Sequence, residues 1–430
     1  MRIKRPLPAL TAVGLLLVAV GWPRTPHAQR EFRLDLFGTA APKIKIAIPE
    51  PESATVPAGD RAVLASAMSV LRTDLQMSDL FEVTKTATDS CTVQAVCVAV
   101  AAGAGVELRA TLASLPGKNL IGTRSSHFEE ATSRRAMHQL ADEIVFLITG
   151  EAGIASTRLA YVATSARRKE VWIADADGAG ARRLTGENTL VLSPAWIGAA
   201  NVGYSAYRPG GASICAMGAN GRGRRVVVGG SGLHYGATWS ADGTKLAYVR
   251  TANGVSDIYL AAADGSGAQA LARRSTRIIN ASPCFSPDGR QLAFTSDRSG
   301  RPHIWMRDLA SGQDTRVTLL GDYNDSPSFS PKGDYLAYAT RRGGQFRIGV
   351  IRLFDGEATV ISRGPGSDED PCFAPDGRHI AFSSSRSGQR EVYTMLLDGS
   401  AVRQVTSGKG EKYSPAWSPR DAAFALGTAK

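Results

Sequence analysis

The chain has 430 residues, of which 43% are apolar and 21% are charged, and its formal net charge is +11. This length and apolar content suit an ordered protein with two domains and apolar cores. Lys and Arg are scattered along the chain and do not cluster in one stripe. The charge therefore indicates a basic, solvated surface and argues against a nucleic-acid partner.

The N-terminus has the pattern of an export signal. Basic residues among the first five precede an apolar run from Leu7 to Val20, which is too short for a stable membrane span. We predict a signal peptide over residues 1–28 with cleavage after Ala28, although Pro26 fits the −3 position poorly and Ala19-Val20-Gly21 offers an earlier site. Its removal takes away four cations and lowers the net charge from +11 to +7. No later segment is apolar enough to span a bilayer, so an exported chain without membrane insertion is expected.

Residues 29–42 are predicted to form a mature N-terminal tail. Polar and apolar residues alternate within it, as in an exposed strand, and Gly38 and Pro42 isolate it from the next segment. Such a strand can pair with the sheet edge of another protein or complete a sheet of its own chain, and both readings stay open. The alternating residues are Glu31, Phe32, Arg33, Leu34, Asp35 and Leu36.

Residues 43–150 are predicted to form a small α/β domain. Leu64, Met68, Leu71 and Leu75 recur at helical spacing, and a second helix is expected from Ser133 to Thr149, with Gly150 as its stop. The glycine-rich stretch Ala101–Val106 separates two strand-like runs, so it indicates a hairpin turn and not a phosphate-binding loop. Strands are expected at Lys43–Ile48, Phe81–Lys85, Val93–Ala101 and Val106–Leu112.

After a linker at 151–157, residues 158–430 carry a sixfold repeat. The repeated phrase has the form [ST]-P-x-[WF]-S-P-D-G-x-x-L-A-[FY], and its first aromatic residues are 43 to 46 positions apart. This period, with about four short strands in each unit, predicts a six-bladed β-propeller in which a terminal strand shared by the first and last blades closes the ring. The second unit is degenerate, with a weak Val202-Gly203-Tyr204 strand. The anchoring aromatics are Trp196, Trp239, Phe285, Phe329, Phe373 and Trp417.

Five cysteines are an odd number for an exported protein. Cys284 and Cys372 occupy the same position in alternate repeats, which should be too far apart for a disulfide, so they are expected to be core residues. Cys91 and Cys97 could pair only if the chain turns between them, and we expect them to remain unpaired.

The order of domains and several local motifs resemble the TolB family of the Tol-Pal cell-envelope system. The motifs are Leu71-Arg72-Thr73-Asp74-Leu75, the junction from Leu147 to Val162, and the closing phrase Pro415-Ala416-Trp417-Ser418-Pro419. The resemblance covers nearly the whole mature chain, and the degenerate second blade and the tail after Pro419 depart from the family's pattern. It implies a monomeric, non-catalytic periplasmic scaffold without cofactor or metal, which supports outer-membrane integrity and constriction at division.

The resemblance also implies two binding regions. The N-terminal residues Glu31–Leu36 correspond to the segment that engages TolA, and binding of the peptidoglycan-associated lipoprotein would order or release this segment. The lipoprotein would bind at one mouth of the propeller channel, on polar loops that precede each Ser-Pro phrase and supply convergent hydrogen-bonding groups. The expected lipoprotein-binding residues are His234, Tyr235, Ala237, Asn280, Ala281, Asn324, Asp325, Asp368, Glu369, Asp370, Glu411 and Lys412.

Other functions stay open at this point. The carboxylates Asp325, Asp368, Glu369 and Asp370 could hold a cation, although a solvated acidic rim is the preferred reading. A peptidase would need a Gly-x-Ser-x-Gly elbow, and Gly229–Leu233 fails at its last position. A metal-dependent lyase would need His234, His303 and His379 in one layer, whereas they fall at different places in their repeats. A propeller that binds a carbohydrate or peptide is the remaining alternative.

Overall fold

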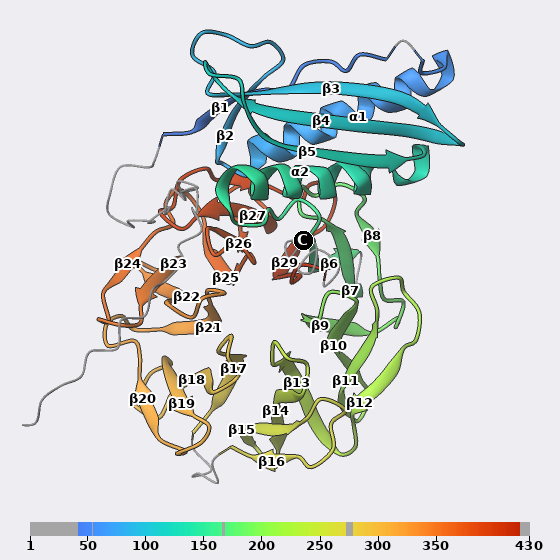
Figure 1. Ribbon diagram of the computed structural model, residues 1–430. Coiled ribbons are helices and arrows are strands. Elements are labelled where there is room, and N and C mark those ends of the chain that lie inside the picture. Colours follow the sequence, from blue (N-terminus) through green and yellow to red (C-terminus); the bar gives the residue numbers. More distant parts are fainter. Residues whose placement is uncertain (1–41, 54, 166–167, 272–277, 422–430) are drawn as a thin grey trace, which may run out of the picture. The chain divides into compact units, whose positions relative to one another are not determined.

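The computed structural model describes residues 42–53, 55–165, 168–271 and 278–421, all within one compact unit. An α/β domain comes first and a ring of antiparallel sheets follows (Figure 1). The tail residues Glu31–Leu36 and the predicted signal peptide lie outside the described residues. In the described part, no helix is both long and apolar enough to cross a membrane.

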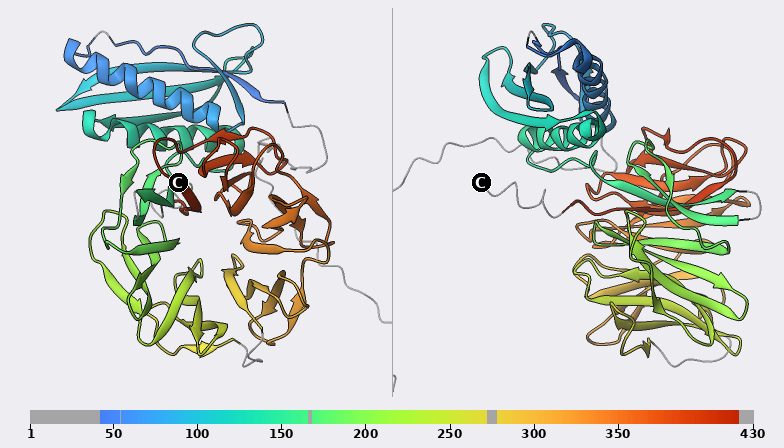
Figure 2. Two further views of the ribbon diagram at one scale, coloured as in Figure 1. Left: turned by 180° about the vertical axis from the view of Figure 1, so that it is seen from behind. Right: turned by 90° about the vertical axis from the view of Figure 1, so that its right-hand side faces the viewer.

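The α/β domain is a five-stranded sheet with two helices on one face (Figure 2). Alternate residues of the long central strands point into a core shared with the helices, whereas Val96 and Val100 lie on the exposed opposite face. The sheet order is β2-β1-β3-β4-β5. The elements are β1 (Ile44–Ala47), α1 (Ala58–Met77), β2 (Phe81–Thr84), β3 (Val93–Ala102), β4 (Gly105–Ser114), β5 (Asn119–Phe128), the 3-10 turn η1 (Glu130–Thr132) and α2 (Ser133–Thr149).

The predicted helices and hairpin of this domain are confirmed. Helix α2 has the predicted bounds, and Gly150 follows it with a φ of 78°, the left-handed cap that glycine favours. Gly103 turns the chain between β3 and β4 with a φ of 58°. Strand β5 was not predicted, because only Phe128 of its ten residues is buried and its sequence lacks a clear alternation.

The described strands of the repeat region form six four-stranded blades around a common axis (Figure 1). Strand β29 from the end of the chain is the innermost strand of blade 1 and pairs with β6, so the predicted closure is confirmed. Blade 1 contains β29 (Lys412–Trp417), β6 (Arg158–Ser165), β7 (Arg168–Asp175) and β8 (Arg182–Arg183). Blade 2 contains β9 (Leu190–Ile197), β10 (Asn201–Arg208), β11 (Gly211–Gly218) and β12 (Arg225–Val228). Blade 3 contains β13 (Gly232–Trp239), β14 (Lys245–Ala252), β15 (Val255–Ala262) and β16 (Gln269–Ala270).

The other three blades are separate sheets. Blade 4 contains β17 (Asn280–Phe285), β18 (Gln291–Ser296), β19 (His303–Asp308) and β20 (Asp314–Arg316). Blade 5 contains β21 (Asn324–Phe329), β22 (Tyr335–Arg342), β23 (Gln345–Arg352) and β24 (Ala358–Val360). Blade 6 contains β25 (Asp368–Phe373), β26 (His379–Ser384), β27 (Glu391–Leu396) and β28 (Arg403–Gln404).

The weak strand expected in the second repeat is a full strand, β10. Its Gly203 replaces the alanine found at the same place in the other blades, as at Ala247 and Ala293. A Cβ atom at Gly203 would lie 2.2 Å from the indole ring of Trp239. Glycine therefore stands here because the aromatic anchor of blade 3 packs directly on the backbone of β10.

All five cysteines are free thiols in the structure. Cys91 and Cys97 are buried in the α/β domain, and burial raises the pKa of Cys97 to about 11. Cys284 and Cys372 lie in the innermost strands of blades 4 and 6, where burial raises the pKa of each to about 11.

Buried charges join the α/β domain to blade 6. The carboxylate of Asp79, between α1 and β2, accepts a hydrogen bond of 2.7 Å from Arg403 Nη2 and one of 3.0 Å from Lys43 Nζ. His379 Nε2 lies 3.4 Å from the same carboxylate, and His379 Nδ1 lies 2.7 Å from Asp376 Oδ2. These contacts leave the Asp79 charge compensated although the side chain is buried.

The linker is fixed by Asp142 of α2. Its carboxylate accepts hydrogen bonds from Ala155 N at 2.7 Å, from Ser156 N at 2.9 Å and from Ser156 Oγ at 2.5 Å. Burial nevertheless raises the pKa of Asp142 to about 6. Two of its three partners are backbone amides, so this short segment leaves α2 in a defined direction and enters β6.

We expect thermal stability to fall between about pH 6.5 and pH 9. Burial lowers the pKa of His379, but the carboxylates of Asp376 and Asp79 outweigh it and raise the pKa to about 8. A folded-state pKa above the unfolded value means that protonation stabilises the fold below about pH 6.5 and that this gain is lost as the pH rises through 8. The shift corresponds to about 2 kcal/mol, so His379→Gln should lower the melting temperature at pH 6 and flatten its pH dependence.

His127→Gln is the matched control, because His127 is exposed on β5 and its Nε2 atom lies 3.0 Å from the Ala102 carbonyl oxygen, away from any carboxylate in the described hydrogen bonds and ion pairs. Thermal unfolding followed by circular dichroism from pH 6 to pH 9 gives the comparison. A pH dependence in His379→Gln as steep as in the unmutated chain would show that the interface does not depend on this proton.

Candidate functional site

Each innermost strand contains a β-bulge at the start of the repeated phrase. Two of its residues lie opposite one residue of the second strand, and the first of the two has a left-handed backbone with φ between 49° and 60°. The second residue is proline in five of the blades, which suits a position whose amide is outside the ladder. The left-handed residues are Ser193, Gly236, Ser282, Ser326, Asp370 and Ser414.

An aromatic residue of the second strand lies opposite every bulge. It is the [FY] of the repeated L-A-[FY] phrase, and it is buried in all six blades. The bulge and this aromatic residue therefore occupy paired positions of the same ladder in every blade. The six residues are Tyr161, Tyr204, Tyr248, Phe294, Tyr338 and Phe382.

The bulge also places two residues on the same face that simple alternation would separate. In blade 4, Asn280 and Phe285 are five positions apart, yet they pair with Ser296 and Leu292, which share one face of β18. Phe285 packs against blade 3, and Asn280 Nδ2 donates a 2.9 Å hydrogen bond to Asp257 Oδ1 in the third strand of that blade. An innermost strand of this kind can therefore hold the preceding blade by an aromatic anchor and a polar contact.

We call the five polar contacts of this kind the inter-blade clasps. They are His234 Nδ1 with the Ala212 carbonyl oxygen (3.2 Å), Asn280 with Asp257 (2.9 Å), Asn324 with His303 (2.9 Å), Asp368 with Arg347 (3.9 Å) and Lys412 with Glu391 (3.0 Å).

The prediction that these residues lie in exposed loops is wrong. His234, Asn280, Asn324, Asp368 and Lys412 belong to innermost strands, and their side chains are buried. Ala237, the second residue of the bulge in blade 3, is buried as well. A polar residue followed by a Ser-Pro pair is typical of a loop, so the sequence pattern predicted one. In the structure the strand begins at this polar residue and continues past the bulge.

The remaining predicted residues are more accessible. Tyr235, Ala281, Asp325, Glu369 and Asp370 are half-buried in innermost strands, and Glu411 is exposed just before β29. The innermost strands begin at one end of the ring, which we call the mouth face, and these six residues lie at or near it. Whether they bind a lipoprotein stays a prediction.

The mouth carboxylates are engaged within the chain and do not form a solvated rim. Asp370 Oδ2 accepts hydrogen bonds of 3.1 Å from Ser383 Oγ and from Ser414 Oγ, and Asp325 Oδ1 accepts one of 2.6 Å from Thr295 Oγ1. Arg390 Nη2 donates to Glu369 Oε1 at 2.9 Å. Burial raises the pKa of Asp370, and the nearby Asp325 charge adds to this rise. The contacts with Ser414 and Thr295 join neighbouring blades, and all four leave less capacity for a cation than the sequence suggested.

An arc of exposed apolar side chains lies on the mouth face, and sequence reasoning missed it. Its members come from four consecutive blades, at or just before the start of β9, β13, β17 and β21. Ile279, Leu319 and Leu320 expose 56%, 72% and 73% of their surface. Leu233 and Ile279 each precede a polar residue in the sequence and so resemble the first residue of an ordinary strand. We call Leu190, Leu233, Ile279, Leu319 and Leu320 the apolar arc.

Aromatic pairs stand beside this arc. The ring centroids of Tyr207 and Tyr235 are 6.5 Å apart, and those of Tyr323 and Phe346 are 5.4 Å apart with an edge-on geometry. All four residues are half-buried. Aromatic residues, tyrosine among them, are enriched at the energetic centre of protein–protein interfaces.

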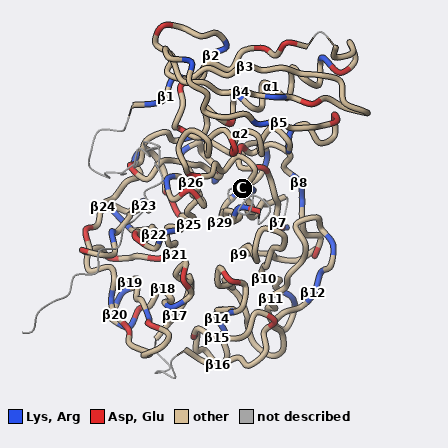
Figure 3. Tube along the Cα trace, viewed as in Figure 1, with Lys and Arg blue, Asp and Glu red and all other residues tan. Residues whose placement is uncertain are grey.

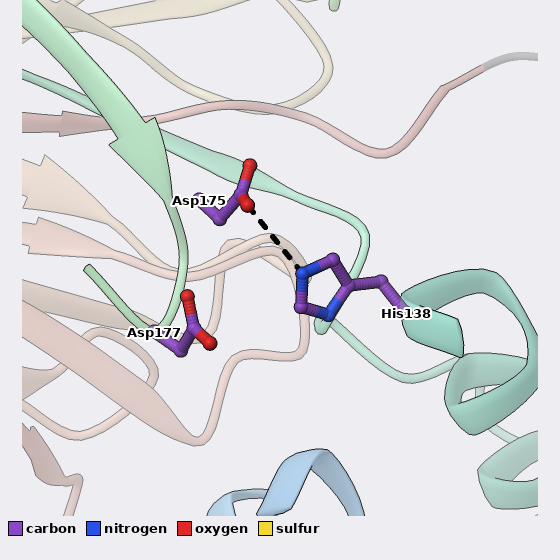
Figure 4. Close-up of side chains that lie close together, drawn as sticks. All are labelled: His138, Asp175 and Asp177. Carbon is purple, nitrogen blue, oxygen red and sulfur yellow. Dashed lines mark ion pairs between the residues drawn. The ribbon is translucent and has the colours of Figure 1, made fainter. Parts of the chain in front are cut away.

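Among the described residues, His138, Asp175 and Asp177 form a group whose side chains could approach a metal ion together (Figure 4). Their ligand atoms lie within 4.8 Å of one another, but Arg134 donates hydrogen bonds to both carboxylates. Burial lowers the pKa of His138, yet Asp175 and Asp74 outweigh burial and raise the pKa to about 9. A protonated imidazole cannot ligate a metal, so this group is better described as an ion-pair network between α2 and blade 1.

Of the three histidines considered from the sequence, His379 lies at the domain interface described above, and His234 and His303 take part in inter-blade clasps. Burial lowers the pKa of His234, and burial with the nearby Arg316 and Arg301 charges lowers that of His303.

Lys and Arg are scattered over the described chain and do not gather on one surface (Figure 3).

Comparisons with known proteins agree with this architecture. A family model described as "TolB beta propeller domain" matches residues 146–421. The Tol-Pal system protein TolB of Bordetella pertussis is 32% identical over 186 residues, which are 43% of this chain and 42% of that protein. A protein TolB homolog of Chlorobium luteolum is 33% identical over 184 residues, 42% of this chain and 41% of that protein.

A solved structure extends the similarity to the whole fold. The crystal structure of TolB from Acinetobacter baumannii covers 88% of this chain and 98% of its own, with a TM-score of 0.77 and 23% identity. The matched segment is thus less than half the length of the curated relatives, whereas the fold is shared over nearly all of the solved structure.

Removal of a clasp should destabilise the propeller. Asp368 Oδ1 accepts hydrogen bonds of 2.6 Å from Ser384 Oγ and 2.9 Å from Arg386 Nη2, and the Asp368 side chain is fully buried. Asp368→Ala leaves buried donors without their anion, so we expect the free energy of unfolding to fall by about 3 kcal/mol. Glu411→Ala removes an exposed carboxylate on the same face and should unfold like the unmutated chain in urea. Equal unfolding midpoints for the two variants would contradict the structural role of Asp368.

Proposed function

Because the chain belongs to the TolB family, we propose that it is a non-catalytic periplasmic component of the Tol-Pal cell-envelope system. In this role it binds the peptidoglycan-associated lipoprotein on the mouth face of the propeller and supports outer-membrane integrity and constriction at division. The observation that carries the proposal is the apolar arc. Five of the eleven exposed large hydrophobic residues of the described chain lie on this one face.

The chemistry of the mouth face suits a folded protein partner. The apolar arc covers blades 2 to 5, while blades 6 and 1 present the polar residues Glu369, Arg390 and Glu411. An apolar patch beside a polar margin is the common anatomy of a protein interface. The carboxylate–arginine pair can give the partner its orientation, because charge complementarity contributes more to specificity than to affinity.

The second partner is proposed from the family resemblance alone. TolA would pair with the mature N-terminal segment Glu31–Leu36, whose alternating residues suit a strand added to a partner's sheet. A chain that begins at residue 37 tests this part, since it should lose TolA binding and keep lipoprotein binding.

Calorimetric titration with the soluble domain of the same organism's peptidoglycan-associated lipoprotein tests the proposal. The exported chain should bind it one-to-one. Ile279→Ser and Leu320→Ser should each weaken binding by roughly tenfold, because each removes a large exposed apolar side chain from the arc. Neither variant should lower the melting temperature, since both side chains are already exposed.

Phe354→Ser is the matched control. Phe354 is 81% exposed but lies between β23 and β24, on the face opposite the mouth. Unchanged binding in all three variants would remove the arc from the interface. A folded chain that does not bind the lipoprotein at all would favour a propeller that binds a carbohydrate or peptide.

A further inference from the structure

A cavity of about 560 Å³ lies between the start of α2 and the loops of blades 1 and 2. These loops follow the innermost and third strands, so the cavity is at the end of the ring opposite the mouth face. Helix α2 contributes Arg134, Arg135 and His138 to its lining, and blade 1 contributes Arg158 and Arg182. The volume falls within the range of small-molecule sites, which is about 300–1,000 Å³.

The positive charges in this cavity are only partly compensated. Arg134 is held by Asp175 and Asp177, and Arg135 Nη2 lies 3.6 Å from Asp421 Oδ2. Arg158 and Arg182 instead donate to backbone oxygens, Arg158 Nη2 to that of Ala199 at 2.7 Å and Arg182 Nη2 to that of Ala219. Among the residues that the structure describes, no carboxylate forms an ion pair with either of these two arginines.

The arginines are close enough to act on one another. Burial lowers the pKa of Arg158, the charges of Asp421 and Asp175 oppose this change, and the charges of Arg135 and Arg182 reinforce it. A guanidinium group carries five N–H donors, so the single backbone contact of each leaves donors for a ligand. Clustered guanidinium groups are the residues best suited to recognise phosphate and carboxylate.

The position of α2 adds to the positive potential. Arg134 and Arg135 stand in the first turn of the helix, and that turn contains no acidic residue. The N-terminal end of a helix carries the positive end of its dipole, so cations are disfavoured there and anions are favoured.

We propose that this cavity binds a small anion with two or more phosphate or carboxylate groups, held by Arg158 and Arg182 from blade 1 and by Arg135 from α2. Because the ligand would contact the α/β domain and the propeller together, its binding would hold the two domains in one arrangement. The proposal does not depend on lipoprotein binding, which concerns the other face of the ring.

Titration calorimetry and thermal unfolding of the exported chain test the proposal, with pyrophosphate and citrate as probes. Each probe is compared with potassium chloride at equal ionic strength, which controls for general screening. At least one probe should bind one-to-one and raise the melting temperature. The probe that binds with the lower dissociation constant shows whether the site prefers phosphate or carboxylate groups. Arg158→Gln and Arg182→Gln should each weaken binding by roughly tenfold.

Arg183→Gln is the matched control, because Arg183 is the exposed neighbour of Arg182 in β8 and does not line the cavity. It should bind the probe like the unmutated chain. Arg158 packs over the Trp196 ring at 5.2 Å, so its replacement also affects folding, and the exposed Arg182 keeps the test independent of stability. The proposal is overturned if neither probe binds beyond the salt control, or if Arg183→Gln weakens binding as much as Arg182→Gln.

Discussion

The organisation of the propeller depends on one extra residue in each innermost strand. A strand of uniform alternation would send the aromatic anchor and the polar residue five positions before it to opposite faces. The bulge brings both to the face that meets the preceding blade, as Phe285 and Asn280 show. The left-handed residue, the proline after it and the ring opposite it are consequences of the same geometry.

The two faces of the ring differ because all six innermost strands run in the same direction, from the mouth face to the opposite face. The turn that follows the innermost strand of blade 6 meets the α/β domain, where Asp79 receives hydrogen bonds from Arg403 and Lys43 and lies beside His379. The mouth face, where the strands begin, retains exposed leucines and an isoleucine on four consecutive blades. Buried polar contacts directly beneath these residues keep the blades together, so the surface that a partner would meet rests on a rigid base.

The sequence predicted the fold better than the site. The 44-residue period gives the number of blades, and the helical spacing with Gly150 gives the bounds of α2, since both patterns repeat a strong apolar signal. Strand β5 was not predicted, because it is a polar strand at the edge of the sheet and lacks a clear apolar alternation. The clasp residues were assigned to loops because a bulge changes which face a side chain takes without any sign in the hydrophobic pattern. The apolar arc could not be predicted from the sequence, because the exposure of Leu320 or Ile279 depends on how neighbouring blades meet. The apolar pattern of a single strand does not describe this contact.

Hydrogen exchange of the exported chain, measured with and without the soluble domain of the peptidoglycan-associated lipoprotein, tests the central claim most directly. Our account predicts slower exchange on binding at residues 189–192, 231–235, 278–281 and 318–323, where the chain enters the innermost strands of blades 2 to 5. Exchange at residues 353–357, on the opposite face, should not change. Protection confined to that opposite face or to the exposed side of the α/β sheet, with none at the apolar arc, would contradict the account.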